Sequence, residues 1–162
     1  VCADFFKDQN QDANGLFTIE SKGLLGLRNI TELSVNTQIY EMASDFIQKI
    51  SQREDAVIVG RCADYALEDN PYAVSVFIKA SLDERVQRIK RIYELNDSKA
   101  ADLIQKTDKR RASYYNYYSS KKWGEAKSYN LCIDSGLVGI DGAIDMILKF
   151  IELKEKNMGK DI

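Results

Sequence analysis

Three short apolar runs constrain the fold more than any other feature of this sequence. They cover residues 56–60, 74–78 and 130–134, and segments with helical periodicity lie between and after them. A short, mainly apolar run is typical of a strand buried on both faces, as in a parallel sheet. Strands that alternate with helices, without a hairpin signal, predict a parallel α/β sheet.

Apolar residues that recur every three or four positions predict four helices around these strands. Asn36 is the expected N-cap of the first helix. Ser81 and Glu84 have the spacing of a capping box at the start of the second helix. Residues 1–35 show no sustained period, and we expect loop there with short helical pieces. The helices are expected at about 36–54, 81–95, 97–118 and 140–151.

Length and composition indicate a single globular domain over residues 1–162. No apolar run approaches the ~18 residues of a membrane span, and no signal peptide opens the chain. The three cysteines lie far apart without zinc-binding spacing, so we expect reduced thiols and a cytoplasmic location, with no metal site. No membrane partner is expected.

The sequence contains no histidine, which excludes Ser-His-Asp and Cys-His catalysis. Charge is unevenly distributed, because residues 79–127 hold 13 Lys or Arg against 7 Asp or Glu in a chain of net charge −2. A cationic middle in an acidic chain indicates a local anion site and not general nucleic-acid binding. The alternative is a solvated helix rich in lysine.

Arg61 follows the carboxyl end of the first predicted strand, which is where ligands bind in open parallel sheets. Its planar guanidinium suits a phosphate group, although it could instead pair with Asp64. Arg85 lies in the first turn of the second predicted helix, near the end of a strand, and is a further candidate for reaching a ligand. Asp64 and Asp134 are acids near strand ends, and the alternatives for them are Mg²⁺ binding through water or a local structural role.

A second basic group lies in the helix predicted over 97–118. Lys106 and Arg110 are four residues apart on one face of this helix, and Arg111 lies on the adjacent face. Clustered arginines on a mobile helix could stabilise charge on a transferring phosphoryl group. The alternative is a solvated basic face.

Four tyrosines crowd into residues 114–118, with Trp123 close behind. They could offer a stacking surface for a base. Packing against neighbouring helices is the commoner use of such residues and the interpretation we favour. A third possibility is a docking surface of an interaction protein, which could form a homo-oligomer.

The order and spacing of several segments resemble the cytidylate kinase-like proteins of the P-loop kinase superfamily. The matching segments are residues 56–65, with Gly60-Arg61 at their centre, and 76–85, which contain the capping box. Residues 108–115, Trp123 and residues 129–134 complete the match. The likeness covers about residues 36–151, and residues 96–128 are similar to the helical lid of that family.

The resemblance implies a three-layer parallel sheet with helices on both faces. It implies transfer of the γ-phosphoryl group of ATP to a nucleoside monophosphate, with CMP or dCMP as first candidates and Mg²⁺ as cofactor. Arg61, with Asp64 and Arg85, would bind the acceptor. Arg110 and Arg111 would be the catalytic lid arginines, and Lys106 with Arg111 would contact ATP.

Two departures from the family pattern qualify this expectation. Cys62 follows Gly60-Arg61 where cytidylate kinases often have Asp, so the acceptor is left open. No Gly-x-x-x-x-Gly-Lys-Ser/Thr loop, which would hold the β- and γ-phosphates, occurs in the 162 residues. We therefore expect the central P-loop strand to belong to residues preceding Val1, and the chain alone to be inactive. The alternative is a non-catalytic nucleotide-binding or regulatory module with the kinase fold.

Overall fold

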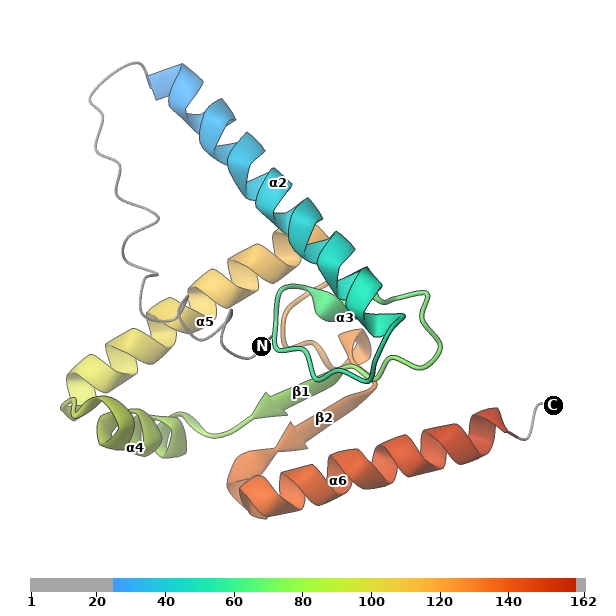
Figure 1. Cartoon of the computed structure of the whole chain (residues 1–162). Coiled ribbons are helices and arrows are strands. Elements are labelled where there is room, and N and C mark those ends of the chain that lie inside the picture. Colours follow the sequence, from blue (N-terminus) through green and yellow to red (C-terminus); the bar gives the residue numbers. More distant parts are fainter. Residues whose placement is uncertain (1–24, 160–162) are drawn as a thin grey trace. The chain divides into compact units, whose positions relative to one another are not determined.

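The structure is a computed structural model that describes residues 25–159, and their side chains from residue 36 onward (Figure 1). The chain divides into two compact units, residues 1–38 and 39–162, and the description below concerns the second. The elements are α2 (Leu25–Ser51), α3 (Ala63–Ala66), β1 (Val76–Lys79), α4 (Leu82–Tyr93), α5 (Asp97–Ser119), the 3-10 turn η2 (Ala126–Ser128), β2 (Leu131–Asp134) and α6 (Ser135–Met158).

Strands β1 and β2 form a two-stranded parallel sheet, in which Val76 pairs with Leu131 and Lys79 with Asp134. The last pair also forms an ion pair, with 3.3 Å between Lys79 Nζ and Asp134 Oδ2. Helix α6 packs against both strands, and Ile133 of β2 is only 1% exposed. The predicted mixed α/β architecture with a parallel sheet is therefore confirmed, as are the second and third predicted strands.

The first predicted strand is wrong for the described part of the chain. Residues 56–60 run without regular secondary structure, and Val57 and Val59 are 97% and 83% exposed. A strand exists only through hydrogen bonds to a neighbour, and no described strand lies beside this segment. The apolar composition of residues 56–60 is typical of a strand, but residues 25–159 contain no strand that pairs with this segment.

The predicted helices over 81–95 and 97–118 match α4 and α5 closely. The prediction of a first helix beginning at Asn36 is wrong, because α2 begins at Leu25 and Asn36 lies inside it. Helix α6 also begins earlier than predicted, at Ser135, and is broken at Gly139, whose φ of 73° is not helical. The loop predicted for residues 1–35 is wrong from residue 25 onward, where α2 runs, and its part over residues 1–24 lies outside the described residues.

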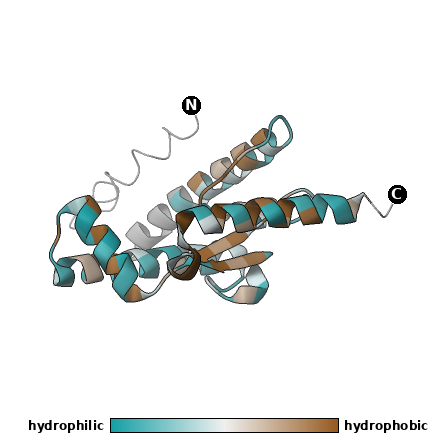
Figure 2. Ribbon diagram, turned by 90° about the horizontal axis from the view of Figure 1, so that it is seen from below, coloured by the Kyte–Doolittle hydropathy of each residue, from teal (hydrophilic) through white to brown (hydrophobic). Residues whose placement is uncertain are grey.

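Helices α4 and α5 pack against each other through a small apolar cluster. Val86 of α4 meets Ala100 and Ile104 of α5, all 9% exposed or less. An ion pair with 2.7 Å between Arg85 Nη2 and Asp108 Oδ1 extends this contact along α5. Figure 2 shows that both strands are hydrophobic and that polar residues dominate α4.

The capping box at the start of α4 is present as predicted. The Ser81 side chain accepts a hydrogen bond from the Glu84 backbone N–H, and the Glu84 carboxylate accepts one from the Ser81 N–H at 3.1 Å. The same carboxylate lies against Gly136, where a Cβ atom would collide with it. The capping box therefore also packs the start of α4 against the start of α6, through Glu84 and Gly136.

We expect Ser81→Ala to lower the free energy of unfolding by about 1 kcal/mol, because an orphan N–H of the first helical turn loses its acceptor. Thermal unfolding followed by circular dichroism measures the change. Ser98→Ala is the matched control, since Ser98 lies in the first turn of α5 and its side chain makes no hydrogen bond among the described residues. Equal stability of the two variants would contradict a capping role for Ser81.

Candidate functional site

The candidate site is built around a tight turn at residues 60–62. Gly60, Arg61 and Cys62 have φ values of 74°, 57° and 54°, so three successive residues adopt the left-handed region. This conformation costs about 1–2 kcal/mol for each non-glycine residue, and such strain persists only where contacts with the surrounding structure stabilise it. Arg61 is thus presented by a turn that the rest of the structure must stabilise.

Burial of Cys62 anchors one side of the turn. Its side chain is 3% exposed, and it is the N-terminal flanking residue of α3, whose Ala66 N–H donates to the Cys62 carbonyl at 2.9 Å. Burial, with the nearby Asp64 charge, raises the pKa of the Cys62 thiol to about 12. The thiol is therefore protonated at neutral pH and acts as an apolar anchor, not as a nucleophile.

Asp64 connects α3 to α5. The Tyr115 hydroxyl donates a hydrogen bond to Asp64 Oδ2 at 2.6 Å, and Tyr115 is 6% exposed. Burial, reinforced by the hydrogen bond to the Asp64 carboxylate, raises the pKa of Tyr115 well above its ordinary value. The Tyr115 ring also stacks on Tyr129, with ring centroids 5.9 Å apart.

Arg61 approaches α5 at the neighbouring tyrosine. Burial raises the pKa of Tyr114, and the Arg61 guanidinium lowers it, so the guanidinium is close to this hydroxyl. The Tyr114 hydroxyl is nevertheless the buried side-chain oxygen that finds no partner of good hydrogen-bond geometry among the described residues. The Arg61 guanidinium thus lies beside this hydroxyl without reaching good hydrogen-bond geometry.

Helix α5 places a second arginine beside this turn. At about 100° and 1.5 Å per residue, Arg111 lies roughly 60° around the helix from both Asp108 and Tyr114, and within about 5 Å of each along the axis. Asp108 holds Arg85, and Tyr114 meets Arg61. Helical geometry therefore places Arg111 between the two α5 residues that contact Arg85 and Arg61, within about two turns.

Arg110 and Lys106 lie on other faces of the helix than Tyr115. Arg110 is exposed and about 140° around α5 from Tyr115, but only about 40° from Tyr114, which lies next to Arg61. Lys106 is about 180° from Tyr115, and its ammonium group pairs with Asp102 at 2.7 Å on an exposed face. The roles predicted for Arg110 and Lys106 stay predictions.

The position of the Arg61 turn differs from the predicted one. Asp64 bonds to Tyr115, which stacks on Tyr129, two residues before β2 begins. The turn thus lies near residues that enter β2, whereas a position beyond the carboxyl ends of the strands was expected. The reason is that residues 56–60 are not a strand of the described sheet, so the sheet does not direct Arg61.

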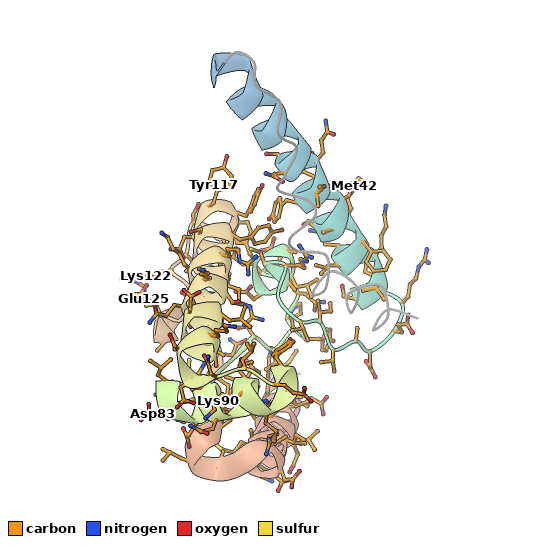
Figure 3. All side chains as sticks on the ribbon, turned by 90° about the vertical axis from the view of Figure 1, so that its left-hand side faces the viewer. Met42, Asp83, Lys90, Tyr117, Lys122 and Glu125 are labelled. Atoms are coloured by element: carbon orange, nitrogen blue, oxygen red, sulfur yellow. The ribbon has the colours of Figure 1, made fainter. Side chains whose placement is uncertain are left out.

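Three of the four clustered tyrosines pack inside the unit. Tyr118 stacks on Tyr40 with ring centroids 4.3 Å apart and lies 4.8 Å from the ring of Tyr114. Tyr117 is 59% exposed and projects from α5, as Figure 3 shows. Sequence reasoning missed Tyr129 and Cys62 as parts of the site, because their contacts depend on pairing between distant segments.

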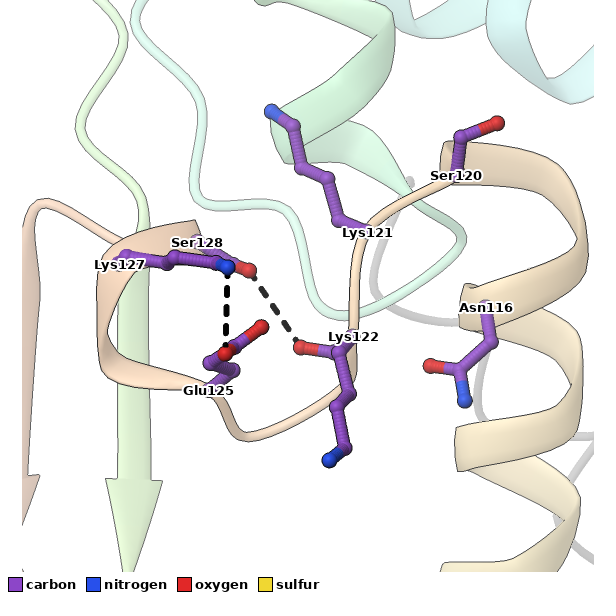
Figure 4. A pocket seen from close by; sticks show the side chains of 7 residues that line it. All are labelled: Asn116, Ser120, Lys121, Lys122, Glu125, Lys127 and Ser128. Carbon is purple, nitrogen blue, oxygen red and sulfur yellow. Dashed lines mark hydrogen bonds and ion pairs between the residues drawn. The ribbon is translucent and has the colours of Figure 1, made fainter.

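A hollow of about 480 Å³ follows the end of α5 (Figure 4). Lys127 in it pairs with Glu125, and Lys121 pairs with Glu68, which leaves Lys122 as its unpaired charge within the described part of the chain. Ion pairs therefore neutralise two of the three lysines of the hollow. It is lined by Asn116, Ser120, Lys121, Lys122, Glu125, Lys127 and Ser128.

Among residues 25–159, no three cysteine, aspartate or glutamate side chains converge in a way that could hold a metal ion. None of the helices described there combines the length and apolar character that crossing a membrane requires.

Known proteins of similar sequence confirm the predicted family. Residues 4–137 match the cytidylate kinase-like family, so the match begins and ends earlier than the predicted 36–151. A crystal structure of an uncharacterized protein from Eubacterium ventriosum ATCC 27560 is 38% identical, with a TM-score of 0.68. The similarity covers 70% of this chain and 65% of that one, so the chain spans less than two thirds of the length of its relative. No curated protein matches the sequence.

The raised pKa of Cys62 gives a testable dependence of stability on pH. The unfolded thiol loses its proton near its ordinary pKa of 9.0, but the native thiol only near 12. The free energy of unfolding should therefore fall as pH rises above about 9. The raised pKa values of Tyr40, Tyr114, Tyr115 and Tyr129 should steepen the fall above about pH 10.

We expect Cys62→Ala to flatten this dependence between pH 8 and 10, where the thiol dominates, whatever its effect on stability at pH 7. Urea unfolding at several pH values measures the slope. Cys132→Ala is the control, because the Cys132 side chain is exposed. A slope in Cys62→Ala equal to that of the unmodified protein would show that the native thiol titrates normally.

Proposed function

Since the chain belongs to the cytidylate kinase-like family, we propose that it carries the acceptor and lid portions of a phosphotransferase. The reaction proposed is transfer of the γ-phosphoryl group of ATP to a nucleoside monophosphate, with CMP or dCMP as first candidates. The observation that supports it best is that α5 carries Arg111 between Asp108 and Tyr114, the residues that contact Arg85 and Arg61. Phosphoryl transfer requires positioned positive charge far more than covalent chemistry by the protein.

Each arginine has a distinct task in this proposal. Arg61 binds the phosphate of the acceptor, because a rigid turn presents its planar fork of donors. Arg111 neutralises charge on the transferring phosphoryl group, with Arg110 joining it on closure of the lid. Arg85 contributes to acceptor binding, and its pairing with Asp108 fixes α5 relative to α4.

Asp64 and Lys106 have less direct roles. Asp64 supports the acceptor side through its bond to Tyr115, which is one helical turn from Arg111. Lys106 contacts ATP only after exchanging its exposed ion pair with Asp102, which costs little because such surface pairs contribute about 0–1 kcal/mol.

We propose that the full sheet is the three-layer P-loop kinase arrangement, with a further parallel strand beside β1. Ile78 of β1 is 53% exposed, and Val57 and Val59 are almost fully exposed. Parallel strands are normally buried on both faces, so apolar surface of this kind suits an added strand. Such a strand would also give residues 56–60 a hydrogen-bonded neighbour.

ATP and Mg²⁺ would be bound mainly by groups that this chain does not show. The sequence has no Walker-type loop for the β- and γ-phosphates, and residues 25–159 hold no cluster of carboxylates for the metal. Mg²⁺ is commonly bound through one or two carboxylates and the phosphates themselves. The same lack of a Walker-type loop supports the second candidate function, a nucleotide-binding or regulatory module without catalysis.

A coupled assay of ADP release on the full-length protein, with CMP, dCMP and other monophosphates, tests the proposal. We expect Arg61→Ala and Arg111→Ala each to lower kcat/KM by about 100-fold or more, a loss of about 2.7 kcal/mol of transition-state stabilisation. Arg61→Ala should act through the KM of the acceptor, and Arg111→Ala through kcat.

Arg91→Ala is the matched control, because Arg91 is exposed near the end of α4 and its substitution removes the same charge. It should change kcat/KM by less than about twofold. Binding of a monophosphate without turnover would favour the regulatory module. Absence of both binding and turnover with every nucleotide would refute both functions.

A further inference from the structure

The turn that presents Arg61 is attached to the rest of the unit through side chains, such as those of Arg61 and the buried Cys62. Its own hydrogen bonds are local, such as those from the N–H groups of Ala63 to Gly60 and of Tyr65 to Cys62. These bonds define the shape of α3, but they do not attach it to a neighbour. Two successive non-glycine residues with positive φ need such an attachment.

Besides the contact of Arg61 with Tyr114 and the Lys121 ammonium 5.7 Å from the centre of the Tyr65 ring, three polar contacts between described residues attach α3 and the two residues after it to other elements. Lys121 pairs with Glu68 at 3.3 Å, but the Glu68 side chain is 51% exposed, and such pairs contribute little. Gln48 Nε2 donates to the Ala66 carbonyl at 3.1 Å, on an exposed surface. The bond from the Tyr115 hydroxyl to Asp64 is the shortest of the three, and its donor is the residue buried to 6% exposure.

We propose that Tyr115 is a positioning residue for Arg61, acting through the hydrogen bond from its hydroxyl to Asp64. The bond holds α3, and hence the left-handed turn at residues 60–62, against α5. The Tyr115 ring is itself fixed by stacking on Tyr129, whose hydroxyl accepts a hydrogen bond from the Gly124 N–H. The Tyr115 hydroxyl is therefore aimed at Asp64 by a ring with little freedom.

The consequence for a ligand rests on the proposed function. Arg111 precedes Tyr115 by one turn of α5, so a movement of this helix towards a phosphoryl group also moves the hydroxyl that holds Asp64. Tyr115 then couples the lid arginine to the acceptor arginine. The attachment of the turn itself does not depend on any reaction, and it can be tested without substrate.

The Cys62 thiol is the reporter for that test. It is buried within the turn, whereas Cys132 is exposed and gives an internal reference in the same molecule. Pulsed alkylation at pH 8, followed by peptide mass mapping, measures the labelling rate of each cysteine separately. Tyr115→Phe removes the hydroxyl and keeps the ring, and Tyr117→Phe removes an exposed hydroxyl from the same helix as the matched control.

We expect Tyr115→Phe to label Cys62 about 10-fold faster than the unmodified protein, with the rate of Cys132 unchanged, and Tyr117→Phe to have no effect. An unchanged Cys62 rate in Tyr115→Phe, or an equal acceleration in Tyr117→Phe, would overturn the proposal.

Turnover supplies the second readout in the full-length protein. Tyr115→Phe should raise the KM for the acceptor monophosphate about 10-fold and leave the KM for ATP unchanged. A general loss of folded protein would instead lower the apparent kcat with both KM values unchanged, and that result would overturn the positioning role. If the unmodified protein has no activity, the proposed function fails, while the alkylation rates still decide how the turn is held.

Discussion

The parallel pairing of β1 with β2 is the constraint on which the rest of the structure depends. Parallel neighbours cannot be joined by a hairpin, so the chain between Lys79 and Leu131 must cross over and return to the starting end of the sheet. Helix α4 leaves from the carboxyl end of β1, and α5 makes the return with 23 residues, about 34 Å in length. One helix therefore contacts both the first turn of α4 and the residues before β2.

This return path explains why separate basic groups meet. Asp108 in the middle of α5 holds Arg85, and Tyr114 and Tyr115, two turns later, meet Arg61 and Asp64. The buried stripe of α5 that makes these contacts includes Ala100 and Ile104, which repeat at helical spacing. The same stripe that builds the core with α4 thus continues into the candidate site, and Arg111 lies at its margin.

Local signals in the sequence predicted the elements that depend on local chemistry. The Ser81–Glu84 box fixed the start of α4, and the apolar runs near 76–79 and 131–134 became strands because each could pair with the other. Residues 56–60 have the same signal but no described neighbour, so pairing and not composition decided their state. The last helix was predicted to begin after Gly139, and the break in α6 lies at that glycine, but the helical turn from Ser135 to Val138 was not predicted.

The site was predictable in its parts and not in its connections. Arg61, Asp64 and the basic segment of α5 stand out by charge and position, but the bond from Tyr115 to Asp64 spans 51 residues and follows only from the fold. The proposed reaction has two requirements, a bound acceptor and bound donor phosphates, and they depend on different parts of the protein. The acceptor arginine is held by contacts within residues 39–162, whereas the donor phosphates need a loop that the sequence does not contain. Under the proposed function, acceptor affinity can therefore persist where phosphoryl transfer cannot, because the turn and α5 stabilise each other without any nucleotide.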